Sequence, residues 1–501
     1  MYGSLGNTIW TLCYFVVLCG LSLYGLHRYV IVYLFLKNRR KLPQPLSTFE
    51  TLPRVTVQLP IYNELYVVER LLKSVAALDY PRELLQVQVL DDSTDETTAI
   101  AAARVEELRK QGFDIDLIHR TDRTGFKAGA LEHGLKTCSG EFILILDADF
   151  VPSPDMLQKT IHYFSDDKIG MIQTRWGHLN RTYSLLTRVQ AMFLDGHLLL
   201  EQTARSRSGR FFNFNGTAGL WRRSCIEDAG GWQHDTLTED LDLSYRAQLK
   251  GWRFIFLADL VTPAELPVDM NGFKSQQHRW TKGSIQTCIK LLPSVWRAKL
   301  PLLQKLEATA HLTSNYAYLL LFFLCMLLHP TVGGGTHTIW RMLLVDIPIF
   351  ISASLPAAVF YTCTQRELHP KTWMKEILLL PALIALGIGL AVNNARAVLE
   401  AIFGHQSEFT RTPKYGIEGG QQCWKSSRYI PLKSALPFIE LGFAIYFSYF
   451  LGFAIVHQQW LSIPFLILFQ SGFTYVALTS LAQWSPSLRF QPPQSGSPLA
   501  V

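Results

Sequence analysis

Charged residues are scarce in this sequence: Asp, Glu, Lys and Arg make up only 17% of its 501 residues. Soluble domains carry about 25%, and the deficit is concentrated at the two apolar ends, since residues 53–310 are mixed in character. Cysteine is also sparse, with eight residues and no CxxC pair, which argues against a disulfide framework or a zinc site. The composition indicates a soluble central domain between membrane-like ends.

The net charge of +7 does not favour a nucleic-acid partner, because the basic residues lie mostly beside apolar segments. Such flanks are typical of the cytoplasmic side of membrane spans. The apolar segment 9–26 is uncharged, long enough to cross a membrane, and followed by basic residues at 36–41. A signal peptide has the reverse order. We therefore predict a retained transmembrane helix with residue 36 onward in the cytoplasm.

The C-terminal part is predicted to be a multi-span helical membrane region. Its predicted spans are 311–329, 340–362, 434–456 and 460–482. The basic loop 408–416 and the basic residues Lys425, Arg428 and Lys433 belong on the cytoplasmic side, which requires an even number of crossings between residues 300 and 408, whereas three segments there are apolar. We therefore expect a further apolar segment, within 376–403, to lie along the membrane surface or in a protein groove.

The central region alternates strands and helices. Strands are predicted at 54–60, 84–93, 115–120 and 142–146, and helices at 63–78, 96–112 and 125–138. This alternation predicts an α/β domain with a mostly parallel sheet. Ligands of such sheets bind beyond the carboxyl ends of the strands.

Carboxylates follow two of these strands. The buried run 142–146 leads into Asp147 and Asp149, and the second strand ends in Asp91 and Asp92. A turn or a helix cap would explain such residues equally well, with Ser93 or Asp95 capping the helix 96–112. The functional alternative is a site for a divalent cation, a diphosphate and ribose hydroxyls at one sheet edge.

Three later stretches extend this site. Lys127 lies at a glycine-rich helix start, which suits an anion, and 215–219 reads as a tight turn. Glu239 and Asp240 open a helix, either as first-turn acids behind a Thr238 cap or as a general base.

The stretch 273–284 is dense in Arg, Trp, Lys and Gln. This composition is typical of a helix at the membrane interface. It is equally typical of a binding site in which Arg neutralises a diphosphate and Trp stacks on a sugar ring. Together the candidate residues indicate glycosyl transfer from a nucleotide sugar, and direct displacement at the anomeric carbon would invert its configuration.

The motifs support this chemistry through a family resemblance. In order, Asp91/Asp92, Asp147-Ala-Asp149, Thr238-Glu239-Asp240 and Gln276 to Trp280 match the D, DxD, TED and QxxRW motifs of processive family 2 glycosyltransferases. Over about residues 50–300 the sequence resembles cellulose-synthase-like membrane enzymes, and especially the glucomannan 4-β-mannosyltransferase branch and its bacterial relatives.

The resemblance implies a GT-A-type cytoplasmic domain and a role for each matching residue. These roles are Asp240 with Glu239 for catalysis; Asp91, Asp92, Lys127, Asp147, Asp149 and Arg279 for the nucleotide sugar; Gln276, Trp280 and Trp176 for the acceptor; and Asp147 and Asp149, chiefly Asp149, for Mg²⁺ or Mn²⁺. It also implies a gating loop at 409–414 and a product channel between the spans.

The predicted enzyme is an integral membrane, metal-dependent, inverting hexosyltransferase of a bacterial inner membrane or a Golgi-like membrane. Its donor is GDP-mannose or UDP-glucose, and its acceptor a growing β-linked polysaccharide or a membrane lipid. The alternatives are a non-processive glycosyltransferase that makes a membrane glycolipid and a non-catalytic export subunit. Glycoside hydrolysis fits the residues poorly. The sequence does not predict which proteins assemble with this one. The predicted divisions are 1–41, 42–270, 271–310, 311–484 and a disordered tail, 485–501.

Overall fold

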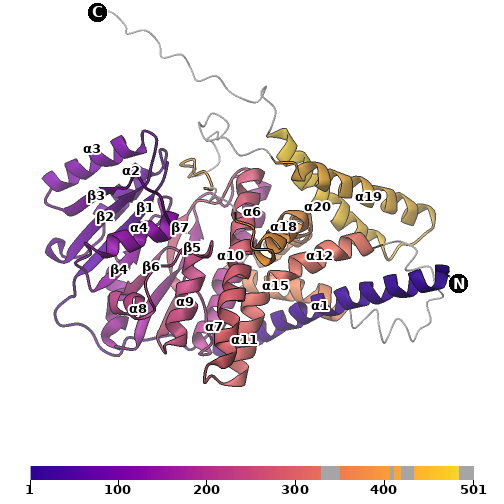
Figure 1. The fold of residues 1–501 in the computed structure, drawn as a ribbon, viewed down its shortest axis with the longest axis horizontal. Coiled ribbons are helices and arrows are strands. Elements are labelled where there is room, and N and C mark those ends of the chain that lie inside the picture. Colours follow the sequence, from indigo (N-terminus) through magenta and orange to yellow (C-terminus); the bar gives the residue numbers. More distant parts are fainter. Residues whose placement is uncertain (1, 329–349, 407–410, 419–433, 484–501) are drawn as a thin grey trace, which may run out of the picture.

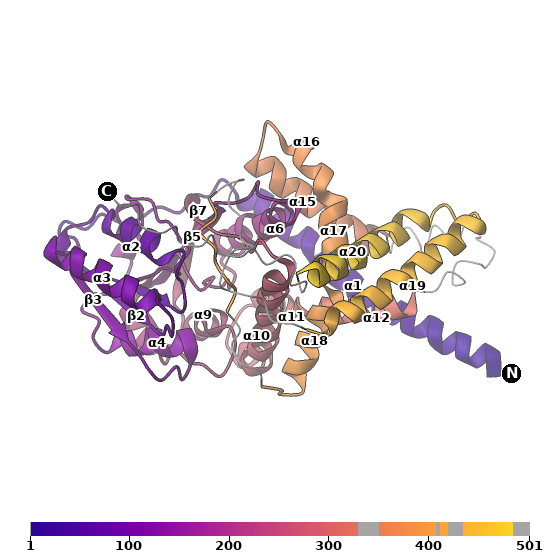
Figure 2. The ribbon, with the colours of Figure 1, turned by 90° about the horizontal axis from the view of Figure 1, so that it is seen from above.

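The computed structural model describes residues 2–328, 350–406, 411–418 and 434–483. An α/β domain occupies one end of the molecule, and long helices extend from it to the other end (Figures 1 and 2). The N-terminal helix α1 (Tyr2–Asn38) runs among these helices before the chain enters the domain.

The domain is built on one seven-stranded sheet with the order β3-β2-β1-β4-β6-β5-β7. The strands are β1 (Val55–Ile61), β2 (Leu85–Asp91), β3 (Asp114–His119), β4 (Phe142–Ile145), β5 (Ile169–His178), β6 (Gly219–Arg222) and β7 (Arg253–Ala264). Only β6 runs against its neighbours, since it pairs antiparallel with both β4 and β5. The prediction of a mostly parallel α/β sheet is confirmed.

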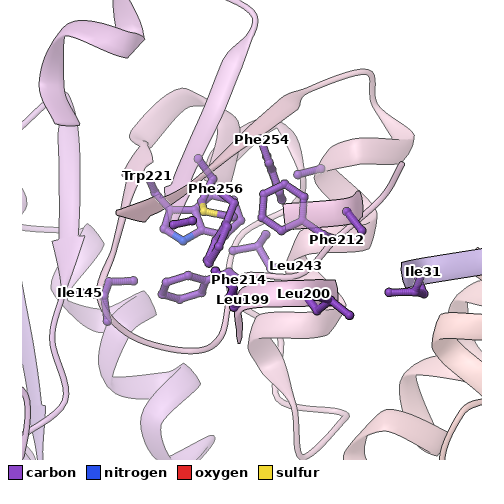
Figure 3. Packing of buried hydrophobic residues seen from close by; sticks show 14 of the residues in the cluster. Ile31, Ile145, Leu199, Leu200, Phe212, Phe214, Trp221, Leu243, Phe254 and Phe256 are labelled. Carbon is purple, nitrogen blue, oxygen red and sulfur yellow. The ribbon is translucent and has the colours of Figure 1, made fainter. Parts of the chain in front are cut away.

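Strand β4 is buried on both faces because the sheet lies between two apolar layers. Phe142 and Leu144 join a core with α2 (Val68–Ala76) and α3 (Thr97–Lys110). Ile143 and Ile145 face a second core that contains Phe214, Trp221 and Phe254 (Figure 3). This second core continues to Ile31 of α1, so the N-terminal helix packs directly onto the α/β domain.

The first helix of the α/β domain, α2, is shorter than the sequence predicts. Helix α2 begins at Val68, whereas the apolar pattern suggested residue 63. Asn63 has a left-handed backbone conformation with φ 54°, and its amide N–H donates to Ser93 Oγ. A residue with positive φ cannot belong to a right-handed helix, so the predicted boundary is wrong and residues 63–67 form a turn beside the strand ends.

The remaining elements surround this domain or extend from it. They are α4 (Phe126–Leu135), α5 (Met156–Ile161), α6 (Leu185–Asp195), η3 (Gly196–Glu201), α7 (Gln202–Arg207), α8 (Arg223–Asp228), α9 (Glu239–Leu249), α10 (Met270–Arg297), α11 (Leu302–Thr313), α12 (Tyr316–Leu327), η6 (Phe350–Ser354), α15 (Leu355–Leu368), α16 (Trp373–Glu376), α17 (Leu380–Gly389), α18 (Ala391–Ile402), α19 (Leu436–Val456) and α20 (Ile463–Ala482).

Within the described residues, three helices are long and apolar enough to span a membrane: Ile9–Asn38, Leu436–Val456 and Ile463–Ala482. Two bent pairs raise this number to five if each pair is one span: α11 with α12, bent by 55°, and the 373–389 segment with α18, bent by 43°. The chain is a membrane protein. Residues 340–349 of one predicted span, the basic residues at 425, 428 and 433, and the predicted tail lie outside the described residues.

The segment 376–403 was predicted from the charge pattern to lie along the membrane surface or in a protein groove and not to cross the membrane. It bends where α17 ends and α18 begins. Helix α17 packs mainly on α20, while α18 packs on α10 and α12. Most of α18 is buried, including Asn393 and Asn394. The side chains of Asn393 and Asn394 therefore face protein, whereas Arg396 is exposed.

Candidate active site

A cavity of about 210 Å³ opens at the carboxyl ends of the parallel strands. Every predicted site residue except Asp91 lines it: Asp92, Lys127, Asp147, Asp149, Trp176, Glu239, Asp240, Gln276, Arg279 and Trp280. These residues come from six separate parts of the sequence. The sheet brings the acids to one edge, and α9 and α10 close the cavity from the other side.

Asp91 does not line the cavity, because its carboxylate is used within the protein. It is fully buried and accepts hydrogen bonds from the Ser93 amide at 2.9 Å and the Thr98 hydroxyl at 2.6 Å. His119 Nδ1 lies 2.9 Å from the same carboxylate. Asp95 Oδ1 accepts from the Thr97 amide at the start of α3. The N-cap of this helix is Glu96, without a side-chain cap bond, so the prediction of Ser93 or Asp95 as the cap is wrong.

Asp92 stands where a nucleoside could bind. Its carboxylate accepts two hydrogen bonds from Arg120, at 2.8 and 2.6 Å. Beside it the guanidinium of Arg123 lies 3.4 Å from the ring centre of Tyr62, and both residues line the cavity. This stacked pair is a flat surface of the size of a base. Sequence reasoning missed this pair, because Tyr62 and Arg123 lie far apart in the chain and neither belongs to a recognisable motif.

Lys127 connects three of the predicted motifs. It follows Gly125, whose φ of 74° allows α4 to start abruptly, and its ammonium contacts Asp147 and donates to the Gly216 carbonyl at 2.8 Å. Although burial opposes its charge, Asp147 and Glu239 raise the pKa of Lys127. The ammonium is therefore a fixed positive charge in the cavity.

Gly216 belongs to the turn that the sequence predicted at 215–219. Its φ is 83°, and a Cβ atom there would lie 3.1 Å from Asp240 Oδ2 and 3.7 Å from Lys127 Nζ. Glycine is required for the conformation and for the close approach of α9. The turn thus brings backbone against the acids of the helix start.

Asp149 is held by a lysine from far along the chain. Its Oδ2 accepts from the Glu265 amide at 3.0 Å and from Lys414 Nζ at 2.7 Å. Lys414 also donates to the Glu265 carbonyl, and Arg411 pairs with Glu64 at 2.6 Å. The described part of the predicted gating loop, 411–414, therefore lines the cavity; residues 409 and 410 are outside the described residues.

Glu239 and Asp240 begin α9 and face the cavity. Burial raises the pKa of both carboxyls, and repulsion from Glu239 contributes to raising that of Asp240 to about 7. Asp240 is thus half-protonated near neutrality, which suits a general base. Thr238 is the residue before the helix, but its hydroxyl lies 3.2 Å from Thr287 Oγ1 and makes no cap bond.

Arg279 reaches the same acids from α10. Burial lowers the pKa of its guanidinium, and Glu239, Asp147 and Asp240 oppose this shift. An arginine pKa remains far above neutrality, so the guanidinium is charged. Lys127 and Arg279 provide two cations for a phosphate-bearing ligand.

Two tryptophans stand at the junction with a second cavity. Trp176 and Trp280 line the first cavity and also a space of about 2140 Å³ that extends among the helices. The Trp176 ring packs edge-on against Phe150 at 5.3 Å, and its Nε1 donates to the Thr217 carbonyl at 3.4 Å. Flat apolar faces of this kind suit sugar rings.

Among the described residues, the side chains at the carboxyl ends of the strands do not by themselves form a full set of metal ligands. Among the residues that the structure describes, no group of three or more His, Cys, Asp or Glu side chains converges on one point. Asp147 and Asp149 each have an ammonium beside the carboxylate, Lys127 and Lys414 respectively. Two carboxylates fit a Mg²⁺-like ion whose other ligands are phosphate oxygens and water, and the Lys414 ammonium already occupies a cation position.

The chain is similar in sequence to known proteins. Residues 53–283 match the family model described as glycosyltransferase like family 2. The chain is 33% identical to glucomannan 4-beta-mannosyltransferase 2 of Arabidopsis thaliana, over 83% of this chain and 80% of that protein. The chain is a cellulose-synthase-like family 2 glycosyltransferase. As a member of this family it is a hexosyltransferase, so the predicted family and enzyme class are confirmed.

Two further relatives of this glycosyltransferase are informative. It is 35% identical to probable glucomannan 4-beta-mannosyltransferase 7 of Oryza sativa subsp. japonica, over 79% of this chain and 67% of that protein. It shares its fold with a mannosyltransferase from Pyrobaculum calidifontis solved with GDP-Man and Mn²⁺, with a TM-score of 0.51, 20% identity, and coverage of 78% of this chain and 99% of that one.

Proposed function

We propose that this glycosyltransferase transfers mannose from GDP-mannose to the non-reducing end of a growing β-1,4-linked mannan or glucomannan. The observation that carries the proposal is the arrangement of the first cavity. Donor-side cations, an acid pair and two tryptophans meet at one sheet edge, directly before a long second cavity. The sugar and linkage follow the relatives, which are glucomannan 4-beta-mannosyltransferases.

In this proposal the leaving group is stabilised at the acidic edge. Asp147 and Asp149 would hold Mg²⁺ or Mn²⁺ together with diphosphate oxygens. The ion would neutralise part of the charge that develops on the diphosphate. Lys127 and Arg279 add two fixed cations, and Asp92, Tyr62 and Arg123 receive the nucleoside.

The transfer step uses Asp240 as the base. Its carboxylate takes the proton of the attacking acceptor hydroxyl while that oxygen bonds to the anomeric carbon. The bond from this carbon to the diphosphate oxygen breaks, and the nucleoside diphosphate leaves on the opposite face. The configuration is therefore inverted. Glu239, next to Asp240, keeps the proton affinity of the base high by repulsion.

The acceptor would lie on Trp280 and Trp176, with Gln276 beside it, and its older end would enter the second cavity. We infer that 42–270 is the catalytic domain and faces the cytoplasm, because the basic flank 36–41 follows the first span. In the same proposal 1–41 anchors the domain, 271–310 joins it to the membrane, and 311–484 forms the membrane region.

A glycolipid synthase is the second candidate. The second cavity supports it to the extent that much of its wall is apolar and could hold an acyl chain. The two candidates differ in product: a polymer grows without release, whereas a glycolipid receives one or few sugars.

The test uses purified protein in lipid vesicles with radiolabelled GDP-mannose or UDP-glucose, with Mn²⁺, Mg²⁺ or chelator. We expect metal-dependent label from GDP-mannose in a polymer that mannanase digests. Label confined to the lipid extract would favour the second candidate. Incorporation only from UDP-glucose would replace the proposed sugar.

A further inference from the structure

His178 lines the first cavity but has no part in the transfer as proposed above. It is the last residue of β5, two positions after Trp176. Among the described residues, Trp176 lines both cavities, whereas His178 lines the first alone. His178 is in register with Ala264 of β7, and the amide of the next residue, Glu265, donates to Asp149. His178 therefore stands on the donor side of the cavity, away from the acceptor.

A buried carboxylate fixes the imidazole ring of His178. Its Nε2 lies 3.0 Å from Oδ1 of Asp195, the last residue of α6. An ionised carboxylate only accepts, so Nε2 carries the proton and Nδ1 is the acceptor of the neutral ring. Within the described part of the chain Nδ1 makes no hydrogen bond, and it is not enclosed by protein. The wall of the first cavity thus contains an oriented imidazole acceptor that is open to a ligand.

Asp195 is held in turn by an arginine. Its Oδ2 accepts from Arg181 at 2.7 Å, and Arg181 also contacts Glu376 of α16 at 3.2 Å. Asp195 is 3% exposed; although burial opposes its charge, His178 and Arg181 hold the pKa of its carboxyl well below the usual value. Asp195 is therefore an ionised acceptor with a fixed position.

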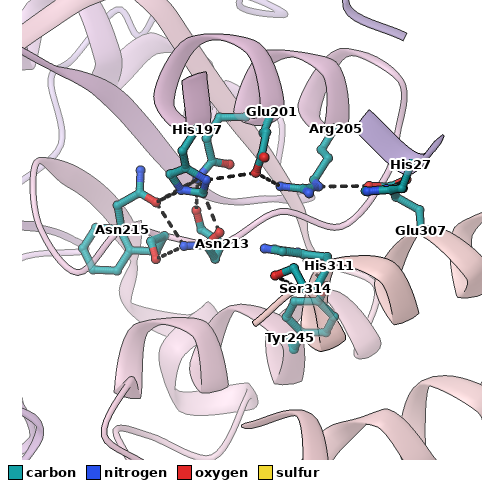
Figure 4. A network of polar contacts seen from close by, with 12 residues as sticks. His27, His197, Glu201, Arg205, Asn213, Asn215, Tyr245, Glu307, His311 and Ser314 are labelled. Carbon is teal, nitrogen blue, oxygen red and sulfur yellow. Dashed lines mark hydrogen bonds and ion pairs between the residues drawn. The ribbon is translucent and has the colours of Figure 1, made fainter. Parts of the chain in front are cut away.

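The element that carries Asp195 is anchored again farther along the chain. Helix α6 continues into the π-helix Gly196–Glu201, a type of insertion that is rare and is frequent at functional sites. Glu201 accepts from Arg205 at 3.0 Å, and Arg205 also donates to Glu307 at 3.1 Å (Figure 4). Buried charged contacts thus hold the segment at both ends of the π-helix, and the ring on Asp195 is oriented before a substrate binds.

We propose that His178 is a further substrate-contacting residue, whose Nδ1 accepts a hydrogen bond from one hydroxyl of the hexose that is transferred. The inference rests on the proposed function, because it requires a hexose donor. In that function the hexose lies between the diphosphate at Asp149 and the base Asp240, which line the same cavity as His178. A donor without this hydroxyl leaves Nδ1 unpaired, so His178 helps to determine which hexose is used.

The test combines His178→Phe with donors that lack one hydroxyl. Purified full-length enzyme receives Mn²⁺, β-1,4-mannohexaose and either GDP-mannose or its 2-, 3-, 4- or 6-deoxy analogue. The measured quantity is kcat/KM for the first transfer, because a 4-deoxy sugar ends the chain. His133→Phe is the matched control, since His133 is exposed on α4 and is not part of the cavity lining.

In the wild type, loss of the hydroxyl that Nδ1 binds should lower kcat/KM at least about fivefold relative to mannose. In His178→Phe the same analogue should be used nearly as well as mannose, while the ratios for the other three analogues stay as in the wild type. His133→Phe should show the wild-type ratios for all four. A purely structural role of His178 would instead lower transfer from every donor by one common factor.

Two results would overturn the proposal: a wild type that uses all four analogues as well as mannose, or four ratios that are the same in the wild type and in His178→Phe. GDP affinity reports whether the variant is folded, and His178→Leu replaces it if it is not. If GDP-mannose supports no transfer at all, the proposed function itself fails; transfer with unchanged ratios removes only the role of His178.

Discussion

The two cavities of this glycosyltransferase meet at Trp280 but differ in charge. The first contains Asp147, Asp149, Glu239 and Asp240, with lysine and arginine side chains against them. The second is lined by amides, imidazoles, the carboxylates of Glu201 and Asp240 and the guanidinium of Arg28, together with a larger number of apolar side chains. A donor with a diphosphate requires fixed opposite charges, whereas a neutral glycan that must move requires weak and repeated contacts. The contrast indicates that recognition is electrostatic on one side of Trp280 and based on neutral hydrogen bonds on the other.

The strongest test of this contrast is Asp240→Asn. An amide cannot accept the proton of the acceptor hydroxyl, so we expect transfer to fall by about 10²- to 10⁴-fold. Donor binding should be retained, since Asp240 is not a ligand of the diphosphate in our proposal. Radiolabel incorporation and GDP binding on the same preparation measure the two effects. Transfer that survives with donor binding lost would reverse the assignment of Asp240.

The pH dependence should follow the same carboxyl. Burial and repulsion from Glu239 raise the pKa of Asp240 to about 7. Only the deprotonated form is a base, so kcat/KM should be constant above this value and fall about tenfold per pH unit below it. GDP affinity over the same range is the control. An acid limb near the ordinary aspartate pKa would show that another group acts as the base.

Asp149→Ala should weaken binding of the sugar donor and leave binding of the acceptor unchanged. Loss of a carboxylate ligand is expected to weaken metal-dependent GDP-mannose binding by at least about tenfold. Titration of donor binding with Mn²⁺ measures the change, with Asp155→Ala, whose carboxylate pairs with Lys159 away from the cavity, as a control. An unchanged response to Mn²⁺ would remove Asp149 from the proposed cation site.

Lys414→Met should have the smallest effect. Without donor, a divalent ion must displace the ammonium that lies 2.7 Å from Asp149. Removing it should strengthen Mn²⁺ binding to the donor-free enzyme a few-fold, by about 1 kcal/mol or less. Calorimetry without nucleotide measures this, and Lys159→Met serves as the control. Weaker binding in Lys414→Met would mean that the loop helps to build the cation site.

Much of the first cavity could be predicted because its motifs are local. Asp147 and Asp149 follow a strand that is buried on both faces, and parallel strands present their carboxyl ends at one edge. The family motifs predicted Asp240, Arg279 and Trp280 as site residues, and the wider family resemblance predicted Lys127. Asp91 was also expected to face the cavity, but it does not line it. The direction of a carboxylate at a strand end depends on the packing around it. Here Thr98 and His119 contact the Asp91 carboxylate inside the protein.

The sequence by itself determined the strand–helix alternation, the acidic strand ends and the apolar helices, because each depends on neighbouring residues and their periodicity. The tertiary structure decided what those residues contact. It brought Lys414 into contact with Asp149 and Arg123 over the ring of Tyr62. It also placed Glu201, Arg205, Glu307 and His27 in one series of buried charged contacts. It also made the π-helix that carries His197 and Glu201. Pairs so far apart in the chain have no periodic signal, since their contact depends on how whole elements pack.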